Sequence, residues 1–283
     1  MSNANIQLQP SPLWLTIIRQ ACVSAWLVLL GVSNYVHAQE LKVGVSFSIP
    51  PYVIQETNSG IELELLRSAL AVKGHSADIK YRPFARTFHE FKKAKLDAIL
   101  NTKKGMLEGV FYSDIVIRFQ NCAISLKRNK FALTKMNDMQ GKSIVAFQRA
   151  ANLLGDEFAQ MAKNNQGYSE ISQQILQVYM LMKHRTDLVI MDKNIFIYYL
   201  KKSYQTGKLS AKEVQQAAVC HNVFPPTTYR FAFLSEQIRD DFNFGLAQIK
   251  QDGTLLAIET KYQRLLSLTL DEDVVIQLAA PTN

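Results

Sequence analysis

Strand and helix patterns alternate along this chain from Leu41 onward, and that alternation restricts the architectures it can adopt. Apolar residues at every second position of 41–47 are typical of a strand, and the leucines of 63–70 are spaced for one face of a helix. A strand at 79–81, a helix at 86–95 and a short buried strand at 97–100 follow. The order βαβαβ is typical of a parallel sheet covered by helices, so we expect an α/β fold.

The first helix has clear expected limits. Pro50 and Pro51 end the opening strand, because proline cannot donate to a strand ladder. Ser59 and Glu62 have the spacing of a capping box, which predicts that a helix opens there and runs to about Lys73.

A second α/β unit is expected to begin near residue 127. The apolar stretch 115–126 is long for one strand, and a polar connection at 131–141 follows it. Later strands are predicted at 143–147, 188–191 and 229–234, and helices at 150–163, 171–184, 194–202, 236–251 and 254–266. The tail from Asp271 carries little pattern.

The N-terminal segment predicts export. The apolar run 21–33 follows Arg19 and precedes Val36-His37-Ala38, which is the arrangement of a secretory signal with cleavage after Ala38. The alternative, a membrane anchor, needs about 20 uninterrupted apolar residues. Arg19 and Asn34 limit this run to fewer, so we expect residues 1–38 to be a signal peptide and the mature chain to be periplasmic.

Charge and residue spacing exclude several classes of function. The chain has 32 basic and 24 acidic residues and a net charge of +8, but the basic residues are scattered rather than gathered on one element. Nucleic-acid binding requires such a cluster. The histidines and cysteines lack zinc-site spacing, and neither a Gly-x-Ser-x-Gly elbow nor a P-loop is present. We therefore expect no nucleic-acid partner, no metal and no cofactor.

Cys122 and Cys220 are the cysteines of the expected mature chain. An exported protein meets an oxidising compartment, where two such residues can pair. Their separation in space does not follow from the sequence, so a disulfide and two buried free thiols both stay open.

Seven short segments in a fixed order carry a family resemblance. They are Pro50-Pro51-Tyr52, Gly60-Ile61-Glu62-Leu63-Glu64-Leu65, Lys95-Leu96-Asp97-Ala98-Ile99, Tyr112-Ser113-Asp114, Met139-Gln140-Gly141-Lys142, Asp187-Leu188-Val189-Ile190-Met191-Asp192 and Lys250-Gln251-Asp252-Gly253-Thr254. Together they resemble the periplasmic solute-binding proteins of family 3, the polar amino-acid type, over nearly all of the mature chain.

The resemblance implies a two-lobed, type II periplasmic-binding-protein fold in which each lobe is a mainly parallel sheet flanked by helices. The chain would cross between the lobes twice. Lobe 1 would then comprise residues 39–126 and 229–270, lobe 2 would comprise 127–228, and 271–283 would form a tail. Open α/β sheets bind ligands beyond the carboxyl ends of their strands, so two facing sheets would form a ligand cleft.

Four candidate ligand residues follow strands of lobe 1. Tyr52 could cover a ligand and donate one hydrogen bond, or could be an ordinary turn residue. The guanidinium of Arg86 matches a carboxylate, although an exposed arginine at a helix start would look the same. Asn101 and Thr102 offer neutral donors and acceptors, or serve as turn residues.

Three further candidates lie in lobe 2. Gln148 and Arg149 stand where a strand passes into a helix, so free backbone N–H groups and a cation could hold an anion. Asp192 follows the strand 188–191, and the matching aspartate of the family commonly receives a ligand ammonium. Asp192 could equally cap the helix that begins near Asn194.

One departure from the family pattern concerns the ligand carboxylate. Members that bind α-amino acids usually carry an arginine about seven residues before the position of Ser113, and this chain has Met106 there. A methionine cannot pair with a carboxylate. Either Arg86, Arg149 or Lys103 takes that role, or the ligand is not an α-amino acid.

The resemblance implies a binding protein rather than an enzyme. We expect a monomer that captures a small polar, amino-acid-like or carboxylate solute for an inner-membrane ABC-type permease. A periplasmic sensor that signals through a membrane partner is an alternative. So is an enzyme like cyclohexadienyl dehydratase, which resembles this fold, because an elimination needs only one well-placed acid or base.

Overall fold

The computed structural model describes residues 38–45, 48–271 and 274–279, which belong to one unit, Ala38–Asn283. The predicted signal peptide, residues 1–38, lies outside the described residues except for Ala38. Phe47, expected in the opening strand, also lies outside them.

The first sheet has the strand order β2-β1-β3-β11-β4, and β5 pairs with β11 beside this path. Its strands are β1 (Glu40–Val45), β2 (Ser76–Tyr81), β3 (Ala98–Thr102), β4 (Phe111–Tyr112), β5 (Ile117–Phe119) and β11 (Thr227–Phe233). β1 pairs in parallel with both β2 and β3, as the alternating pattern predicts. β11 runs antiparallel to its partners β3, β4 and β5.

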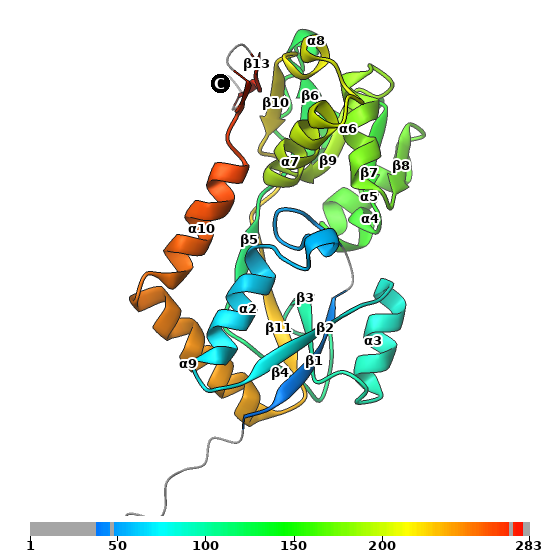
Figure 1. Ribbon diagram of the computed structural model, residues 1–283. Helices are drawn as coiled ribbons and strands as arrows, with labels where there is room; N and C mark the ends of the chain where they lie inside the picture. Colours follow the sequence, from blue (N-terminus) through cyan, green and yellow to red (C-terminus); the bar gives the residue numbers. More distant parts are fainter. Residues whose placement is uncertain (1–37, 46–47, 272–273, 280–283) are drawn as a thin grey trace, which may run out of the picture. The chain divides into compact units, whose positions relative to one another are not determined.

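Helices cover both faces of this sheet (Figure 1). The helices of this region are α2 (Ile61–Ala71), α3 (Phe84–Lys92), α9 (Glu236–Gln251) and α10 (Thr254–Leu265). Leucines of α2 and apolar residues of α9 share one core with β1 and β11, and Phe91 of α3 packs on the opposite face with Ile99. Gly245 allows α2 and α9 to pack closely, because a Cβ there would lie 1.9 Å from the backbone oxygen of Ala69.

The second sheet has the order β14-β10-β6-β9-β7-β8. Its strands are β6 (Asn121–Leu126), β7 (Ile144–Phe147), β8 (Tyr168–Ile171), β9 (Leu188–Asp192), β10 (Ala218–His221) and β14 (Leu278–Ala279). The helices of this region are α4 (Ala150–Leu153), α5 (Asp156–Asn164), α6 (Gln174–Met182), α7 (Lys193–Gln205) and α8 (Ala211–Val214). Apolar side chains of α6 and α7 fill one core, and Phe158 of α5 belongs to another.

The remaining elements are short. They are the 3₁₀ helices η1 (Gln55–Thr57), η2 (Lys127–Asn129) and η3 (Met136–Met139), and the paired strands β12 (Thr269–Asp271) and β13 (Val274–Val275). The expected tail is therefore partly ordered into strands, and β14 pairs with β10 in the second sheet.

Both sheets combine parallel with antiparallel pairs, within the expected α/β fold; parallel pairs are the more numerous in the second sheet and antiparallel pairs in the first. The chain passes from the first sheet to the second between β5 and β6, and returns between β10 and β11. β6, β10 and β11, which adjoin these crossings, pair antiparallel to strands of their sheets. Residues 121–126 pair with β9 and β10 and so belong to the second sheet. The limits of the two lobes, 39–126 with 229–270 for lobe 1 and 127–228 for lobe 2, stay a prediction.

The stretch 115–126, which is long for one strand, forms two strands, β5 and β6. Two local expectations were wrong. The predicted helix 150–163 is divided into α4 and α5 at Gly155, which adopts a φ of 99°. α2 has Gly60 as its N-cap and no side-chain cap, so Ser59 and Glu62 do not form a capping box.

The backbone around Gly60 explains the missing capping box. The N–H groups of Ile61 and Glu62 donate to the carbonyl oxygens of Pro51 and Tyr52, at 3.0 Å in both cases. Gly60 has a φ of 129°, and a Cβ there would lie 2.2 Å from the Tyr52 oxygen. The loop after β1 thus takes the place of a side-chain cap, and the Glu62 side chain is buried instead.

A disulfide joins Cys122 of β6 to Cys220 of β10, with the two Cα atoms 5.3 Å apart. The antiparallel pairing of these strands brings the two residues together. The sequence left open a disulfide or two buried free thiols, and the structure shows the disulfide.

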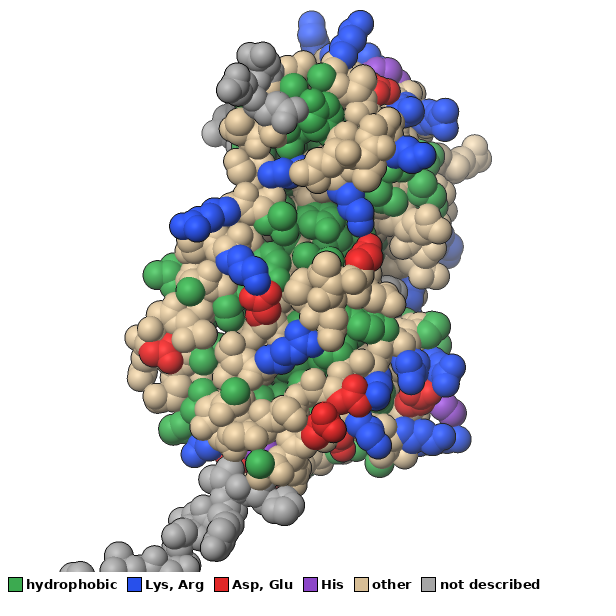
Figure 2. Space-filling model, viewed as in Figure 1, with side chains coloured by type: hydrophobic (Ala, Val, Ile, Leu, Met, Phe, Trp, Pro, Cys, Tyr) green, Lys and Arg blue, Asp and Glu red, His purple; other side chains and the backbone are tan. Residues whose placement is uncertain are grey.

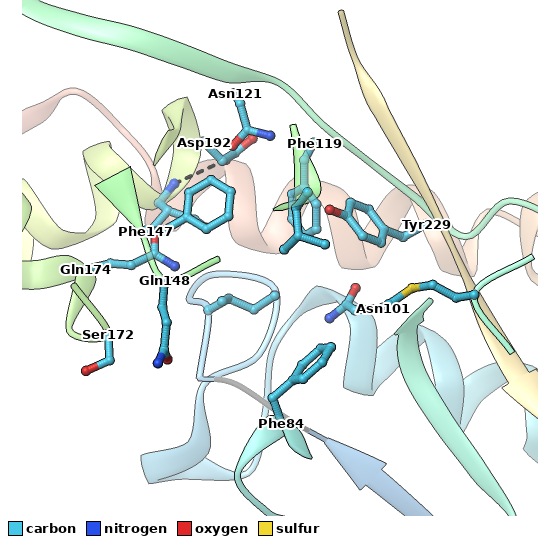
Figure 3. Close-up of a pocket in the computed structure, with 14 residues that line it drawn as sticks. Phe84, Asn101, Phe119, Asn121, Phe147, Gln148, Ser172, Gln174, Asp192 and Tyr229 are labelled. Carbon is cyan, nitrogen blue, oxygen red and sulfur yellow. Dashed lines mark hydrogen bonds between the residues drawn. The ribbon is translucent and has the colours of Figure 1, made fainter. Parts of the chain in front are cut away.

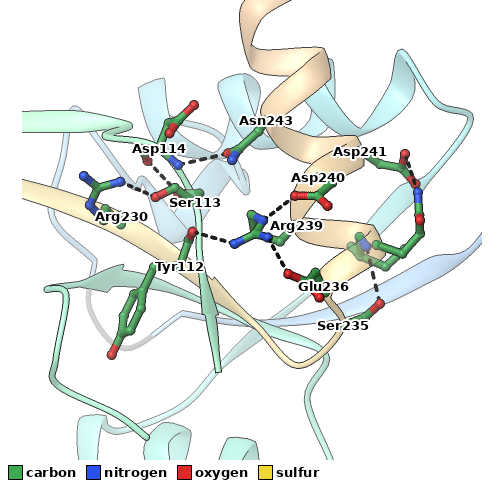
Figure 4. Close-up of polar contacts among 12 residues, drawn as sticks. Tyr112, Ser113, Asp114, Arg230, Ser235, Glu236, Arg239, Asp240, Asp241 and Asn243 are labelled. Atoms are coloured by element: carbon green, nitrogen blue, oxygen red, sulfur yellow. Dashed lines mark hydrogen bonds and ion pairs between the residues drawn. The ribbon is translucent and has the colours of Figure 1, made fainter. Parts of the chain in front are cut away.

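The Tyr112-Ser113-Asp114 segment forms hydrogen bonds with β11 and α9 (Figure 4). The Phe231 N–H donates to the Ser113 hydroxyl at 3.0 Å, and the Arg230 guanidinium donates to the Ser113 carbonyl oxygen. The Asp114 N–H donates to the Asn243 side chain of α9 at 2.9 Å. These contacts hold in place the strand that carries Tyr229.

Acidic and basic side chains are interspersed over much of the face drawn in Figure 2. Within the described ranges, no helix combines the length and the apolar character required to span a bilayer.

Candidate functional site

A pocket lies where strands of both sheets end, and Figure 3 shows the side chains around it. Asn101 belongs to the end of β3, Gln148 directly follows β7, and Asp192 is the last residue of β9. This is the position at which open α/β sheets bind ligands. Its polar lining comprises Asn101, Asn121, Gln148, Ser172, Gln174 and Asp192.

The rest of the lining is apolar and largely aromatic. It comprises Ile49, Phe84, Met106, Phe119, Phe147, Leu153, Ile195 and Tyr229. The rings of Phe119 and Tyr229 meet edge to face with centroids 5.1 Å apart. The Tyr52 ring also meets the Phe119 ring edge to face, with centroids 4.4 Å apart. Such walls favour a ligand that offers apolar surface or a cationic group to the rings.

Asp192 is the charged member of the described lining, and it is 2% exposed. Its Oδ1 accepts hydrogen bonds from the Tyr52 hydroxyl at 3.1 Å and from the N–H groups of Asn194 and Ile195 at 2.9 and 3.3 Å. Its Oδ2 accepts from the Gln120 N–H at 2.9 Å. Asp192 therefore caps α7 and lines the pocket at once, as both interpretations of the sequence allowed.

Burial raises the pKa of Asp192 to about 6, against the opposing effect of the three backbone N–H donors. A cation beside this carboxylate would favour the ionised form. The residue is thus suited to bind an ammonium group near neutral pH.

Glu62 is a second acidic group close to the pocket. It is fully buried, and neither of its carboxyl oxygens has a hydrogen-bond partner among the described residues. Burial raises the pKa of Glu62 to about 8, while the nearby Asn101 amide has a smaller effect that lowers this pKa. Its charge also helps to raise the pKa of Tyr229, after the larger effect of burial. Glu62 therefore interacts with two residues that line the pocket, Asn101 and Tyr229.

The helix start at Gln148 and Arg149 already holds a carboxylate from the chain itself. The N–H groups of Arg149 and Ala151 donate to Glu170 at 2.6 and 2.9 Å. The parallel pairing of β7 with β8 sets Glu170 opposite Ala146 and so delivers this carboxylate. The anion that the sequence suggested for this helix start is therefore Glu170, and Gln148 alone of the predicted pair lines the pocket.

The other predicted residues lie beside the pocket or away from it. Arg86 is on the exposed side of α3 and pairs with Glu90 at 2.6 Å. Thr102 is buried and donates to the Arg230 carbonyl oxygen at 2.8 Å. Tyr52 is linked to the pocket through Asp192, and the Arg149 guanidinium lies 4.4 Å from the centroid of the Phe84 ring.

Lys103 is a cation adjacent to the pocket. Its Nζ donates to the Leu153 carbonyl oxygen at 2.8 Å and lies 5.6 Å from the centroid of the Tyr229 ring. Partial burial lowers its pKa. Met106, the departure noted in the sequence, is itself part of the lining.

Comparison with known proteins identifies the fold. No protein-family model matches the chain, and no curated protein matches its sequence. A histidine kinase sensor domain with similarity to periplasmic binding proteins has a TM-score of 0.63 at 14% identity, over 79% of this chain and 95% of that one. The GluR0 ligand-binding core in complex with L-glutamate has a TM-score of 0.63 at 15% identity, over 82% of this chain and 100% of that one. This chain has the fold of the periplasmic binding proteins.

A third similar structure is an ABC uptake transporter substrate-binding protein from Streptococcus pneumoniae with bound histidine. Its TM-score is 0.61 at 15% identity, over 83% of this chain and 94% of that one. At these identities the likeness to periplasmic binding proteins concerns the fold.

Sequence reasoning missed much of the pocket of this periplasmic-binding-protein fold. Phe119 and Tyr229 lie in strands, where an aromatic ring resembles an ordinary core residue. In the sequence, the predicted capping box accounted for Glu62 as a helix-start residue. Ser172 and Gln174 follow β8, a strand that was not predicted. A position just beyond a strand was the available signal, and it found Asn101, Gln148 and Asp192.

Proposed function

We propose that this chain is a periplasmic solute-binding protein that captures a small polar metabolite between two lobes for an ABC-type importer. The observation that carries the proposal is the pocket, to which the strand ends of both sheets contribute residues. A ligand that contacts both sheets would favour a closed arrangement over an open one. Asp192 supplies the charged contact and the aromatic walls supply apolar surface.

Two features support an extracytoplasmic location. The N-terminal sequence has the pattern of a secretory signal, with Gln39 as the first residue of the expected mature chain. The Cys122–Cys220 disulfide is a bond that persists in oxidising compartments.

The proposal predicts stabilisation by a small polar solute. The mature chain, residues 39–283, would be screened by thermal unfolding against amino acids, organic acids and polyamines. A ligand that binds the native state at a hundred times its Kd stabilises it by about 2.7 kcal/mol, which raises Tm by several degrees. A complete screen without any shift would contradict the proposal.

A matched pair of variants assigns any shift to the pocket. Asp192→Asn removes the charge of the lining and should strongly reduce the ligand-induced rise in Tm. Asp240→Asn makes the same change at an exposed side chain that pairs with Arg239, and it should leave the rise intact.

A sensor role is the second candidate, because a histidine kinase sensor domain shares this fold. Such a protein would report the same ligand to a membrane partner instead of a permease. Crosslinking of the liganded chain in membranes, followed by identification of the attached protein, would separate the two roles.

A dehydratase-like enzyme on this fold is the remaining alternative. The similar structures described above are a sensor domain, a ligand-binding core and a transporter substrate-binding protein, which favours binding without turnover. Incubation with prephenate or arogenate tests this directly, and product formation would replace the binding proposal with an enzymatic one.

A further inference from the structure

The charge of the pocket lining is negative. Among the described residues that line it, Asp192 carries the formal charge, and the others are apolar, aromatic, amide or hydroxyl side chains. Its Oδ1 already accepts three hydrogen bonds, whereas Oδ2 accepts one, from the Gln120 N–H. Each carboxylate oxygen has two lone-pair sites, and Oδ2 receives a single donor from the described residues, so a ligand can supply its second.

The groups that could bind a ligand carboxylate are largely engaged by the protein itself. Glu170 accepts the N–H groups of Arg149 and Ala151 at the start of α4. Arg86 pairs with Glu90, and the Arg149 guanidinium lies over the Phe84 ring. A ligand carboxylate would have to give up its hydration in a largely apolar pocket without a cation in the described lining, which is costly.

Lys103 is the strongest competitor for a ligand carboxylate. Its ammonium group is next to the pocket, but it donates to the Leu153 carbonyl oxygen and faces the Tyr229 ring. A carboxylate would gain this partner only if Lys103 turned away from that contact.

The surroundings of Asp192 add further features that favour a cation. Phe119 and Tyr229 present aromatic rings to the pocket, and ring faces attract ammonium groups.

Resting on the function proposed above, we propose that the pocket selects a small organic amine that carries no carboxylate. The ammonium group donates to Asp192 Oδ2, and the rest of the ligand packs on Phe119 and Tyr229. An α-amino acid with the same side chain binds more weakly, because its carboxylate loses water without a dedicated partner.

Matched pairs of amines and amino acids test this proposal. Cadaverine with lysine, putrescine with ornithine, histamine with histidine and tyramine with tyrosine each differ by one carboxyl group. Titration calorimetry on the mature chain should show at least one amine bound ten or more times tighter than its amino acid. Amino acids that bind as tightly as their amines, or carboxylic acids that bind without an amine, would overturn the proposal and leave the solute-binding function standing. No binding of any compound would overturn both.

Two variants test the assigned roles in the same assay. Asp192→Asn should weaken amine binding at least tenfold, with its unliganded melting curve as the control for folding. Lys103→Met should leave amine binding unchanged or tighter. A tenfold loss of amino-acid affinity in Lys103→Met would identify Lys103 as a carboxylate partner and contradict the proposal.

Discussion

Glu62 illustrates the energetic cost of burying a carboxyl group close to the pocket. It lies in the first turn of α2, is fully buried and has no hydrogen-bond partner within the described chain. Burial raises its pKa to about 8, so the folded state keeps a proton that the unfolded state releases near pH 4.5. The free energy of unfolding therefore falls as pH rises from about 4.5 to about 8, and it levels off above that range.

The variant Glu62→Gln should remove this pH dependence. Between pH 6 and pH 9, wild-type stability should fall by about 2–3 kcal/mol relative to the variant, because the amide does not titrate. Urea unfolding at both pH values measures the difference, and histidine titrations are common to both proteins. The exposed substitution Glu236→Gln is the control and should keep the wild-type pH dependence. Parallel pH curves for wild type and Glu62→Gln would contradict the assignment.

At the scale of elements, the junction of β9 and α7 places the N-cap of a helix in the pocket lining. The last residue of β9, Asp192, accepts the Asn194 and Ile195 N–H groups and so caps α7. Its carboxylate also accepts the Tyr52 hydroxyl from the loop between β1 and α2. One side chain thus links the second sheet to a loop of the first.

Two substitutions at Asp192 should separate the cap from the charge. Asp192→Asn should lose ligand binding, because it removes the charge. Asn is as good an N-cap as Asp, so this variant should be destabilised by less than about 1 kcal/mol. Asp192→Ala should lose binding and also about 1–2 kcal/mol of stability, because the α7 N–H groups and the Tyr52 hydroxyl lose their acceptor. Chemical denaturation of both variants measures this. Equal stability of the two would show that the cap contributes little.

At the scale of the whole molecule, contacts link residues that follow strands of different sheets. Lys103, after β3, donates to the Leu153 carbonyl oxygen of α4, and Glu56 of η1 pairs with Lys202 of α7 at 3.0 Å. The two sheets are also joined covalently through the crossings β5–β6 and β10–β11. This connectivity suits a hinge between two lobes.

Ligand binding should reduce the radius of gyration of the mature chain, because a solute held by both sheets favours the closed arrangement. Small-angle scattering with and without a compound that raises Tm measures the change. A compound of similar size that leaves Tm unchanged is the control. Identical scattering profiles in all three samples would argue against hinge closure and against the predicted lobes.

The sequence alone determined the alternating elements, the α/β fold and the placement of Asn101, Gln148 and Asp192 just at or beyond strand ends. These features depend on local periodicity, because the spacing of apolar residues within a segment is the same whichever segments become its neighbours in the fold. The tertiary structure decided the burial of Glu62, the Cys122–Cys220 bond and the aromatic walls. It also brought Glu170 to the start of α4, through the pairing of β7 with β8. Such outcomes depend on which strands become neighbours, and strand neighbours are chosen by packing over the whole chain rather than by any single segment.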